Sequence, residues 1–229
     1  MIKYVFFDLD ETIIDIKYAQ NMAIVSLYKN FGFDKETDVN SFARVWDDLT
    51  ELHYADYTRK KISYEEQRKR RIVDLFEVFD IELTMLPLDV YDIYLKDFES
   101  FWICFDDVKE TLETLKKNNY KLGIISNGDY NQQVQKLKNT GIFKYFDYVN
   151  TSSQFNFSKP NPKLFENIFS AYSIPLDEVC YVGDSYNNDY LPCKELRVKA
   201  LLLNRTGEKS KYKSITQISS LTEILDNIK

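Results

Sequence analysis

A run of apolar residues that ends in two carboxylates, at positions 4 to 12, constrains the fold of this chain most strongly. Residues 4–7 are apolar or aromatic without alternation, which is typical of a strand buried on both faces, as in a parallel sheet. Asp8 follows this strand directly, and Asp10 comes two residues later. Because open α/β sheets bind ligands at the carboxyl ends of their strands, we expect both carboxylates at such an edge.

Two carboxylates this close repel each other unless one is protonated or a cation lies between them. A divalent metal ion with oxygen ligands would relieve the repulsion between Asp8 and Asp10. The same Asp-x-Asp spacing also occurs in solvated loops without any function. The remainder of the chain has to decide between these two interpretations.

The composition is that of a globular protein. The 229 residues suffice for one α/β domain with an insertion or for two small domains, and 44% of them are hydrophobic. The net charge of −6 argues against a general nucleic-acid or membrane-surface binder. The sequence shows neither a signal peptide nor a long apolar stretch, so we expect a cytoplasmic protein, as a monomer or weak homodimer. We interpret Cys104, Cys180 and Cys193 as reduced thiols, because their spacing fits no metal site.

The hydrophobic pattern changes twice along the chain. Residues 15–101 have helical spacing throughout, which predicts an inserted α-helical domain. From residue 106 onward, helices alternate with buried strands, which are expected at 121–126, 146–150, 179–183 and 198–203. Alternating strands and helices predict an α/β fold with a Rossmann-like, doubly wound parallel sheet, formed by residues 1–14 and 102–229.

Three further strand ends or loops carry polar residues that suit phosphate chemistry. Ser126 and Asn127 follow one predicted strand and can donate hydrogen bonds to phosphate oxygens. Lys159 precedes a proline at the start of a predicted helix, where its ammonium can neutralise an anion. A loop with two carboxylates and two amides, from Asp184 to Asp189, follows another strand and suits Mg²⁺. Each signal alone also fits an ordinary turn or a solvated side chain.

Taken together, these four segments resemble the motifs of the haloacid dehalogenase superfamily over nearly the whole chain. The matching residues are 8–12, Ser126 to Gly128, Lys159 with Pro160, and Gly183 to Asp189. The resemblance implies a core with the strand order 3-2-1-4-5, and it places the chain in the phosphatase branch. The helical insert is similar to the small cap domain of the family's first cap class.

The resemblance also implies a role for each acidic residue. Asp8 would be the nucleophile that forms an aspartyl-phosphate, and Asp10 would be the general acid and base. Mg²⁺ would be the cofactor, held by the side chains of Asp8 and Asp184 and by the backbone carbonyl of Asp10. Asp189, and less strongly Asn188, would support the site from outside the metal ligands.

The phosphoryl group would be bound by Ser126, by the backbone of Asn127 and by Lys159, which would also act in catalysis. The expected function is therefore Mg²⁺-dependent hydrolysis of small phosphate monoesters, such as a nucleotide or a sugar phosphate. Asp10 favours this chemistry over dehalogenation, since the family's dehalogenases lack a carboxylate there. Two alternatives stay open, namely a phosphomutase with the same intermediate and a non-catalytic phosphate-binding protein.

The helical insert carries a basic cluster that allows two interpretations. It could attract a phosphorylated metabolite, or it could be a solvated helix face balanced by nearby acidic residues, which we favour. The cluster consists of Arg59, Lys60, Lys61, Arg68, Lys69, Arg70 and Arg71.

Overall fold

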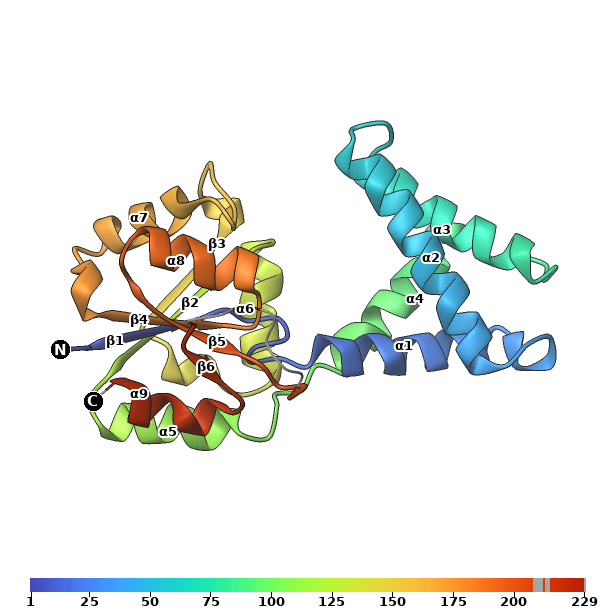
Figure 1. Ribbon diagram of the computed structural model, residues 1–229. Helices are drawn as coiled ribbons and strands as arrows, with labels where there is room; N and C mark the ends of the chain where they lie inside the picture. The colour runs from blue at the N-terminus through green and yellow to red at the C-terminus, as the bar shows by residue number, and fades with distance from the viewer. Residues whose placement is uncertain (208–211, 213–214, 229) are drawn as a thin grey trace. The chain divides into compact units, whose positions relative to one another are not determined.

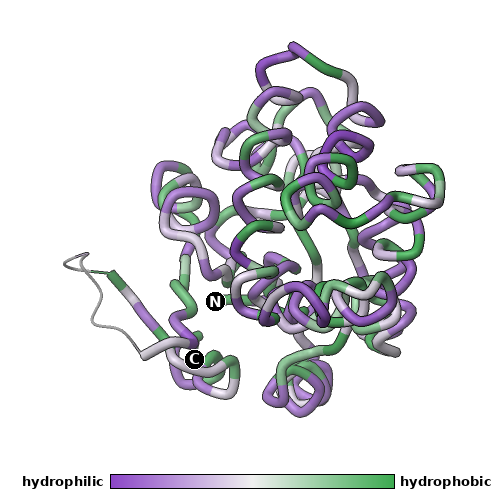
Figure 2. The backbone as a smooth tube through the Cα atoms, turned by 90° about the vertical axis from the view of Figure 1, so that its right-hand side faces the viewer, coloured by the Kyte–Doolittle hydropathy of each residue, from purple (hydrophilic) through white to green (hydrophobic). Residues whose placement is uncertain are grey.

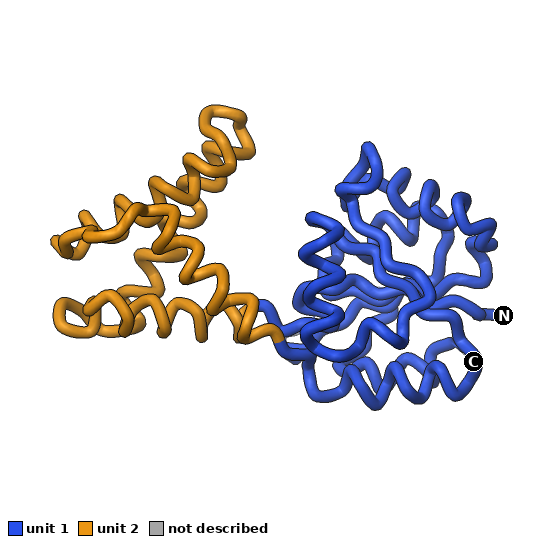
Figure 3. The backbone as a smooth tube through the Cα atoms, turned by 180° about the vertical axis from the view of Figure 1, so that it is seen from behind, with its two compact units in different colours: residues 1–16, 103–229 blue, residues 17–102 orange. Residues whose placement is uncertain are grey.

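The computed structural model describes residues 1–207, 212 and 215–228. The chain divides into two compact units, which Figure 3 shows in different colours. Residues 1–16 and 103–229 form one unit, called the sheet unit here, and residues 17–102 form the other, called the helical unit. Among the described residues, no helix is both long enough and apolar enough to cross a membrane.

The described strands of the sheet unit form one parallel sheet in the order β3-β2-β1-β4-β5-β6 (Figure 1). This confirms the predicted fold class and the order 3-2-1-4-5. The short strand β6 at the edge was not predicted, because two residues are too few to show a pattern. The strands are β1 (Tyr4–Phe7), β2 (Lys121–Ser126), β3 (Tyr148–Thr151), β4 (Val179–Gly183), β5 (Lys199–Leu203) and β6 (Gln217–Ile218).

The strand β1 lies in the middle of the sheet, between β2 and β4. Phe6 and Phe7 are fully buried, as expected for a strand covered on both faces. Phe7 pairs in register with Ile124 of β2 and Val182 of β4. The carboxyl ends of these three strands therefore lie at one edge, where the order of the strands reverses.

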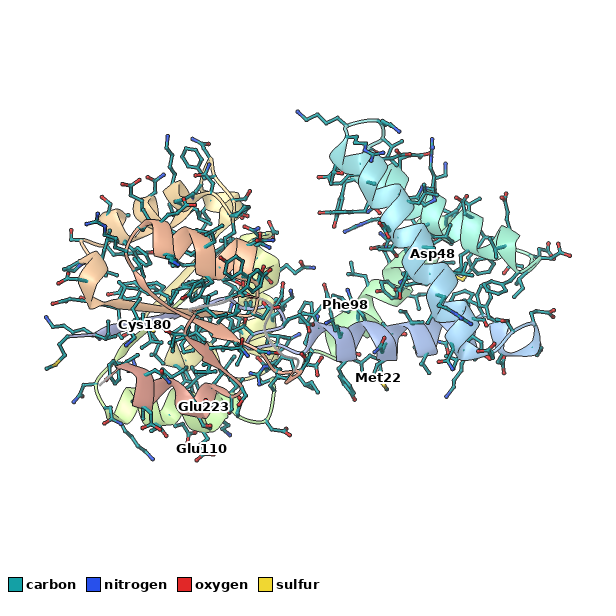
Figure 4. All side chains as sticks on the ribbon, viewed as in Figure 1. Met22, Asp48, Phe98, Glu110, Cys180 and Glu223 are labelled. Carbon is teal, nitrogen blue, oxygen red and sulfur yellow. The ribbon has the colours of Figure 1, made fainter. Side chains whose placement is uncertain are left out.

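Helices cover both faces of the sheet, with α5 and α9 on one face and α7 and α8 on the other (Figure 1). Glu110 of α5 and Glu223, just before α9, lie on the same side, whereas Cys180 lies within the sheet (Figure 4). All three cysteines are free thiols. The helices are α5 (Val108–Lys117), α6 (Tyr130–Asn139), α7 (Pro162–Ala171), α8 (Leu191–Glu195) and α9 (Ile224–Ile228).

Helix starts with a cap or a proline, and several short turns, complete the sheet unit. The side chain of Asn161 accepts a hydrogen bond from the Lys163 backbone and so caps α7, with Pro162 in the first turn. Pro192 likewise lies in the first turn of α8, which continues directly from the π-helical turn Tyr186–Tyr190. The short turns are η2 (Phe143–Tyr145), η3 (Ser152–Gln154), η4 (Leu176–Glu178), η5 (Tyr186–Tyr190) and η6 (Leu221–Glu223).

The helical unit has its own aromatic core. Figure 2 shows hydrophobic and hydrophilic stretches alternating along the backbone, as expected for helices with one buried face. Ser63 accepts a hydrogen bond from the Glu66 backbone at 3.0 Å, as its capping-box sequence predicts. Phe33, Phe42 and Trp46 belong to this core. The elements are α1 (Ile16–Asn30), η1 (Phe33–Lys35), α2 (Val39–Thr58), α3 (Tyr64–Val78) and α4 (Pro87–Ser100).

The basic cluster of the helical unit does not form one solvated face. Arg70 is exposed and forms an ion pair with Glu66 at 2.7 Å, in agreement with the favoured interpretation. Arg71, however, is buried beside the ring of Trp46, so this interpretation is wrong for that residue. The sequence concealed the difference because Arg70 and Arg71 are adjacent, and adjacent helical residues face different directions.

Gly123 of β2 allows the sheet to accommodate the large side chain of Phe6. A Cβ atom at residue 123 would overlap the Phe6 ring. We therefore expect Gly123→Ala to lower the free energy of unfolding by about 1–3 kcal/mol, because overpacking forces the ring and backbone to shift. Urea unfolding checks this. In Phe6→Leu the same Gly123→Ala change should cost clearly less, and an equal cost in both backgrounds would contradict the explanation.

Candidate active site

A cavity of about 330 Å³ opens at the carboxyl ends of β1, β2 and β4. Four aspartates and one lysine contribute to its lining, so it is strongly polar. Every predicted site residue lies in this lining. The lining residues are Asp8, Asp10, Ser126, Asn127, Lys159, Asp184, Ser185, Asn188 and Asp189.

The two carboxylates of the first motif are placed by a strand and a tight loop. Asp8 follows β1, and its backbone N–H donates to the Val182 carbonyl oxygen at 2.9 Å. The loop then turns back on itself, because the backbone of Ile14 donates to the Leu9 carbonyl oxygen. Glu11 adopts a φ of +64° within this turn. The Asp8 side chain is consequently 8% exposed, whereas the Asp10 side chain is 35% exposed.

Lys159 is the central cation of the cavity. Its Nζ lies 2.5 Å from Asp8 Oδ1 and 2.7 Å from Asp189 Oδ1. All three side chains are almost fully buried. Asp189 is itself fixed by the Ser185 backbone N–H, which donates to its Oδ2 at 3.0 Å. The lysine is thus held between the strand-end aspartate and a second, rigidly anchored carboxylate.

Burial and charge act in opposite directions on this ion-pair cluster. Burial raises the pKa of Asp8 to about 7, although Lys159 opposes the shift. Burial alone would lower the pKa of Lys159, but the adjacent Asp8 and Asp189 carboxylates raise it above its usual value. The lysine therefore stays cationic at neutral pH. This single ammonium does not balance the negative charge of the carboxylates around Asp8.

Asp184 adds a further carboxylate at the end of β4. Its backbone N–H donates to Thr12 Oγ1 at 3.1 Å, which joins the fourth motif to the first. Asp184 is exposed as a residue, but partial desolvation of its carboxyl group, followed by the charge of Asp189, raises its pKa to about 6. The carboxylate oxygens of Asp8, Asp184 and Asp189 lie within 4.8 Å of one another. This set of hard oxygen donors, with excess negative charge, fits a small divalent cation such as Mg²⁺.

Ser126 at the end of β2 and the following residue Asn127 also line the cavity. Ser126 is 2% exposed, and its Oγ accepts a hydrogen bond from Gln133 Nε2 at 2.9 Å. The Asn127 side chain forms two hydrogen bonds with the backbone of Lys159, one as donor at 3.0 Å and one as acceptor at 2.9 Å. This side chain therefore holds the lysine loop in place. The expected binding of the phosphoryl group by Asn127 involves its backbone and not this side chain.

The structure also brings together residues that the sequence interpretation missed. The Tyr181 hydroxyl of β4 lies 3.1 Å from Asp189 Oδ1, and the Thr12 hydroxyl contacts Asp184. Gln133 and Lys136 of α6 both contact Asp10, at 3.1 and 2.6 Å. The sequence pattern could have indicated Gln133 and Lys136, because these two polar residues share the buried face of the helix with Leu137.

Gly183 is needed at the end of β4 for a steric reason. A Cβ atom at this residue would overlap the carboxyl group of Asp189. The glycine thus lets Asp189 approach the strand closely enough to reach Lys159. This close approach explains the glycine at residue 183, and the end of the strand places the Asp184 carboxylate directly after it.

Mg²⁺ should stabilise the protein more at pH 7.5 than at pH 5. The pKa of Asp184 is raised, so without metal its contribution to stability is present below about pH 4 and is lost as the pH rises through 6. Metal binding requires the ionised form. At 100 times the dissociation constant, Mg²⁺ should add about 2.7 kcal/mol at pH 7.5 and clearly less at the same concentration at pH 5, where Asp8 and Asp184 are more protonated.

Thermal unfolding with and without Mg²⁺ measures both values. Asp184→Asn should abolish most of the Mg²⁺ effect at pH 7.5, whereas Asp106→Asn, on an exposed loop residue, should retain it. Equal stabilisation at the two pH values would contradict the raised pKa of the carboxylates, and an undiminished Mg²⁺ effect in Asp184→Asn would show that Asp184 is not a metal ligand.

Known proteins with sequences or structures similar to this chain include phosphatases and a dehalogenase. The chain is 28% identical over 206 residues to the glyceraldehyde 3-phosphate phosphatase of Methanothermobacter thermautotrophicus, covering 89% of this chain and 86% of that protein. A HAD phosphatase from Thermococcus onnurineus superposes with a TM-score of 0.63 at 27% identity, covering 99% and 98% of the two chains.

A 2-haloacid dehalogenase from Pseudomonas syringae pv. Tomato gives a TM-score of 0.65 at 21% identity, over 99% of this chain and 97% of that one. This likeness shows a shared fold and does not separate the two chemistries. The family model described as haloacid dehalogenase-like hydrolase matches residues 5–203, a span that includes the whole lining of the cavity. The chain therefore belongs to the haloacid dehalogenase-like hydrolase family.

Proposed function

We propose that the protein is a Mg²⁺-dependent phosphatase that hydrolyses small phosphate monoesters through an aspartyl-phosphate at Asp8. The observation that carries the proposal is the pair of carboxylates in one cavity, with buried Asp8 against a fixed ammonium and Asp10 more exposed beside it. The similarity to two phosphatases, at 28% and 27% identity, supports the same chemistry.

Asp8 and Asp10 divide the reaction between them. The Asp8 carboxylate attacks phosphorus, and the bond to the leaving oxygen breaks as Asp10 donates its proton to that oxygen. Asp10, now ionised, then takes a proton from the water that attacks the aspartyl-phosphate. Inorganic phosphate leaves, and both carboxyl groups return to their starting states. Lys159 keeps the nucleophile oriented throughout, because its Nζ is bound to Asp8 and Asp189.

The remaining residues neutralise and hold the phosphoryl group. The Ser126 hydroxyl, the Asn127 backbone N–H and the Lys159 ammonium are the donors for its oxygens. The Asp8 and Asp184 carboxylates, with the Asp10 carbonyl oxygen, would hold Mg²⁺, which supplies positive charge to the phosphoryl oxygens. Asp189 and Asn188 support this set from the same loop, Asp189 through its ion pair with Lys159.

Asp10 is also the reason to prefer phosphoryl transfer to dehalogenation. A halide leaves as a stable anion and needs no proton, whereas an alkoxide leaving from a phosphate monoester does. A second carboxylate in the cavity has a clear use only in the latter reaction. We propose in addition that the helical unit, residues 17–102, is the family's cap domain, because it is inserted directly after the first strand and motif.

Phosphate release from a panel of monoesters tests the proposed activity. The panel should contain glyceraldehyde 3-phosphate, hexose phosphates and nucleoside monophosphates, each with Mg²⁺ and with chelator. We expect chelator-sensitive release that is concentrated in one class. Transfer of the phosphoryl group to a second sugar hydroxyl without release would instead identify a phosphomutase. Phosphate binding without either reaction would identify a non-catalytic protein.

Asp8→Asn should lower phosphate release on the order of 10⁴-fold or more, because the variant lacks the nucleophile. Its thermal stability should be equal or higher, since burial, and after it the neighbouring carboxylates, disfavour the charge that the variant lacks. Activity assays and thermal unfolding on the same preparation measure both effects. Asp106→Asn should retain full activity, and an Asp8→Asn variant with substantial turnover would rule out Asp8 as the nucleophile.

A further inference from the structure

Asp10 is contacted by a lysine that the proposed mechanism does not use. We propose that Lys136 is a positioning residue, which holds the Asp10 carboxylate at the place where it exchanges protons with the leaving oxygen and with water. This inference rests on the proposed phosphatase function. Lys136 itself does not line the cavity, and it reaches the scheme above through its contact with Asp10.

Helix α6 holds both oxygens of the Asp10 carboxylate. Lys136 Nζ lies 2.6 Å from Asp10 Oδ1, and Gln133 Nε2 lies 3.1 Å from Asp10 Oδ2. Gln133 and Lys136 are three residues apart, so their side chains emerge from the same face of the helix. An aspartate with one anchor could still rotate about that contact. Two anchors from one rigid helix fix both the position and the plane of the carboxyl group, and each oxygen keeps a second lone-pair site at which Asp10 exchanges its proton.

The burial of Lys136 argues against an ordinary surface ion pair. Its side chain is only 5% exposed, whereas exposed pairs of this kind usually contribute little. Burying an ammonium is costly unless it is well paired. Lys136 lies on the helix face that also contains buried Leu137, where burying an apolar residue would cost less free energy. The position of the charge therefore points to a use in the cavity and not to the stability of the helix.

The same helix links the acid to the phosphate-binding side of the cavity. Gln133 Nε2 lies 2.9 Å from Ser126 Oγ as well as 3.1 Å from Asp10 Oδ2. The proton donor and a donor to the phosphoryl oxygens are thus set by one side chain. A general acid must stay within hydrogen-bond reach of the leaving oxygen, and a displacement of about 1 Å can cost about 10²-fold in rate.

The test compares Lys136→Met with Lys138→Met, an exposed lysine on the same helix that contacts the Phe143 ring. Leaving-group release is measured in single turnover with two substrates, an alkyl phosphate and p-nitrophenyl phosphate. The alkoxide needs a proton from Asp10, whereas p-nitrophenolate leaves without one. Lys136→Met should slow the alkyl phosphate by about 10²-fold and p-nitrophenyl phosphate by less than a few-fold. Lys138→Met should change neither rate.

A double-mutant cycle then asks whether Lys136 acts through Asp10. Lys136→Met should cause no further loss in the Asp10→Asn background, because the group that it positions is already inactive. Equal losses for both substrates, or additive losses in the double variant, would overturn the inference and leave Lys136 a structural residue. Lys136→Arg, which retains the charge and should restore part of the rate, replaces the methionine variant if that variant does not fold.

The failure of this inference can be told apart from failure of the proposed function. Wild-type protein that releases no phosphate, or Asp10→Asn with wild-type rates on the alkyl phosphate, contradicts the proposed function. Active wild-type protein with an impaired Asp10→Asn variant and an unimpaired Lys136→Met variant contradicts the role of Lys136 alone.

Discussion

The contact of one buried ammonium with two buried carboxylates is the interaction on which the rest of the site depends. Lys159 lies between Asp8 and Asp189, and without it the edge of the sheet would carry carboxylates with no compensating charge. A buried charge is tolerated only where its partners are fixed. The surrounding hydrogen bonds provide that rigidity, since Asn127 holds the lysine backbone and Ser185 holds Asp189. Four separate segments of the chain meet in this cluster.

Excess negative charge remains after this pairing, and it explains why such a cavity suits a cation and a phosphate together. The raised pKa values of Asp8 and Asp184 both reflect burial, with further contributions from neighbouring carboxylates. A phosphate dianion would be repelled by this cavity on its own. A divalent cation bound to the same oxygens would offset most of this negative charge. Groups that destabilise the metal-free protein are thus the ones that the proposed chemistry requires.

The sequence alone was sufficient to predict the fold and the candidate site residues at the ends of the strands. The apolar run before Asp8, and similar runs before Ser126 and Asp184, identified strands whose ends must converge in a parallel sheet. The partners of those residues were harder to predict. Gln133 and Lys136 lie more than 120 positions from Asp10, and their contacts depend on how α6 is rotated against the sheet. Tyr181 looked like one more apolar strand residue, although its hydroxyl lies beside Asp189.

The two anchors on α6 make the length of one loop more important than its composition. Ser126 ends β2, and α6 begins at Tyr130. Each residue added to this connection would lengthen it by up to about 3.5 Å and shift the start of the helix against the sheet. Such a shift would move Gln133 and Lys136 away from Asp10 even if every site residue were retained. Among related chains, insertions should therefore be tolerated after Asn139, at the other end of the helix, and avoided between Ser126 and Tyr130.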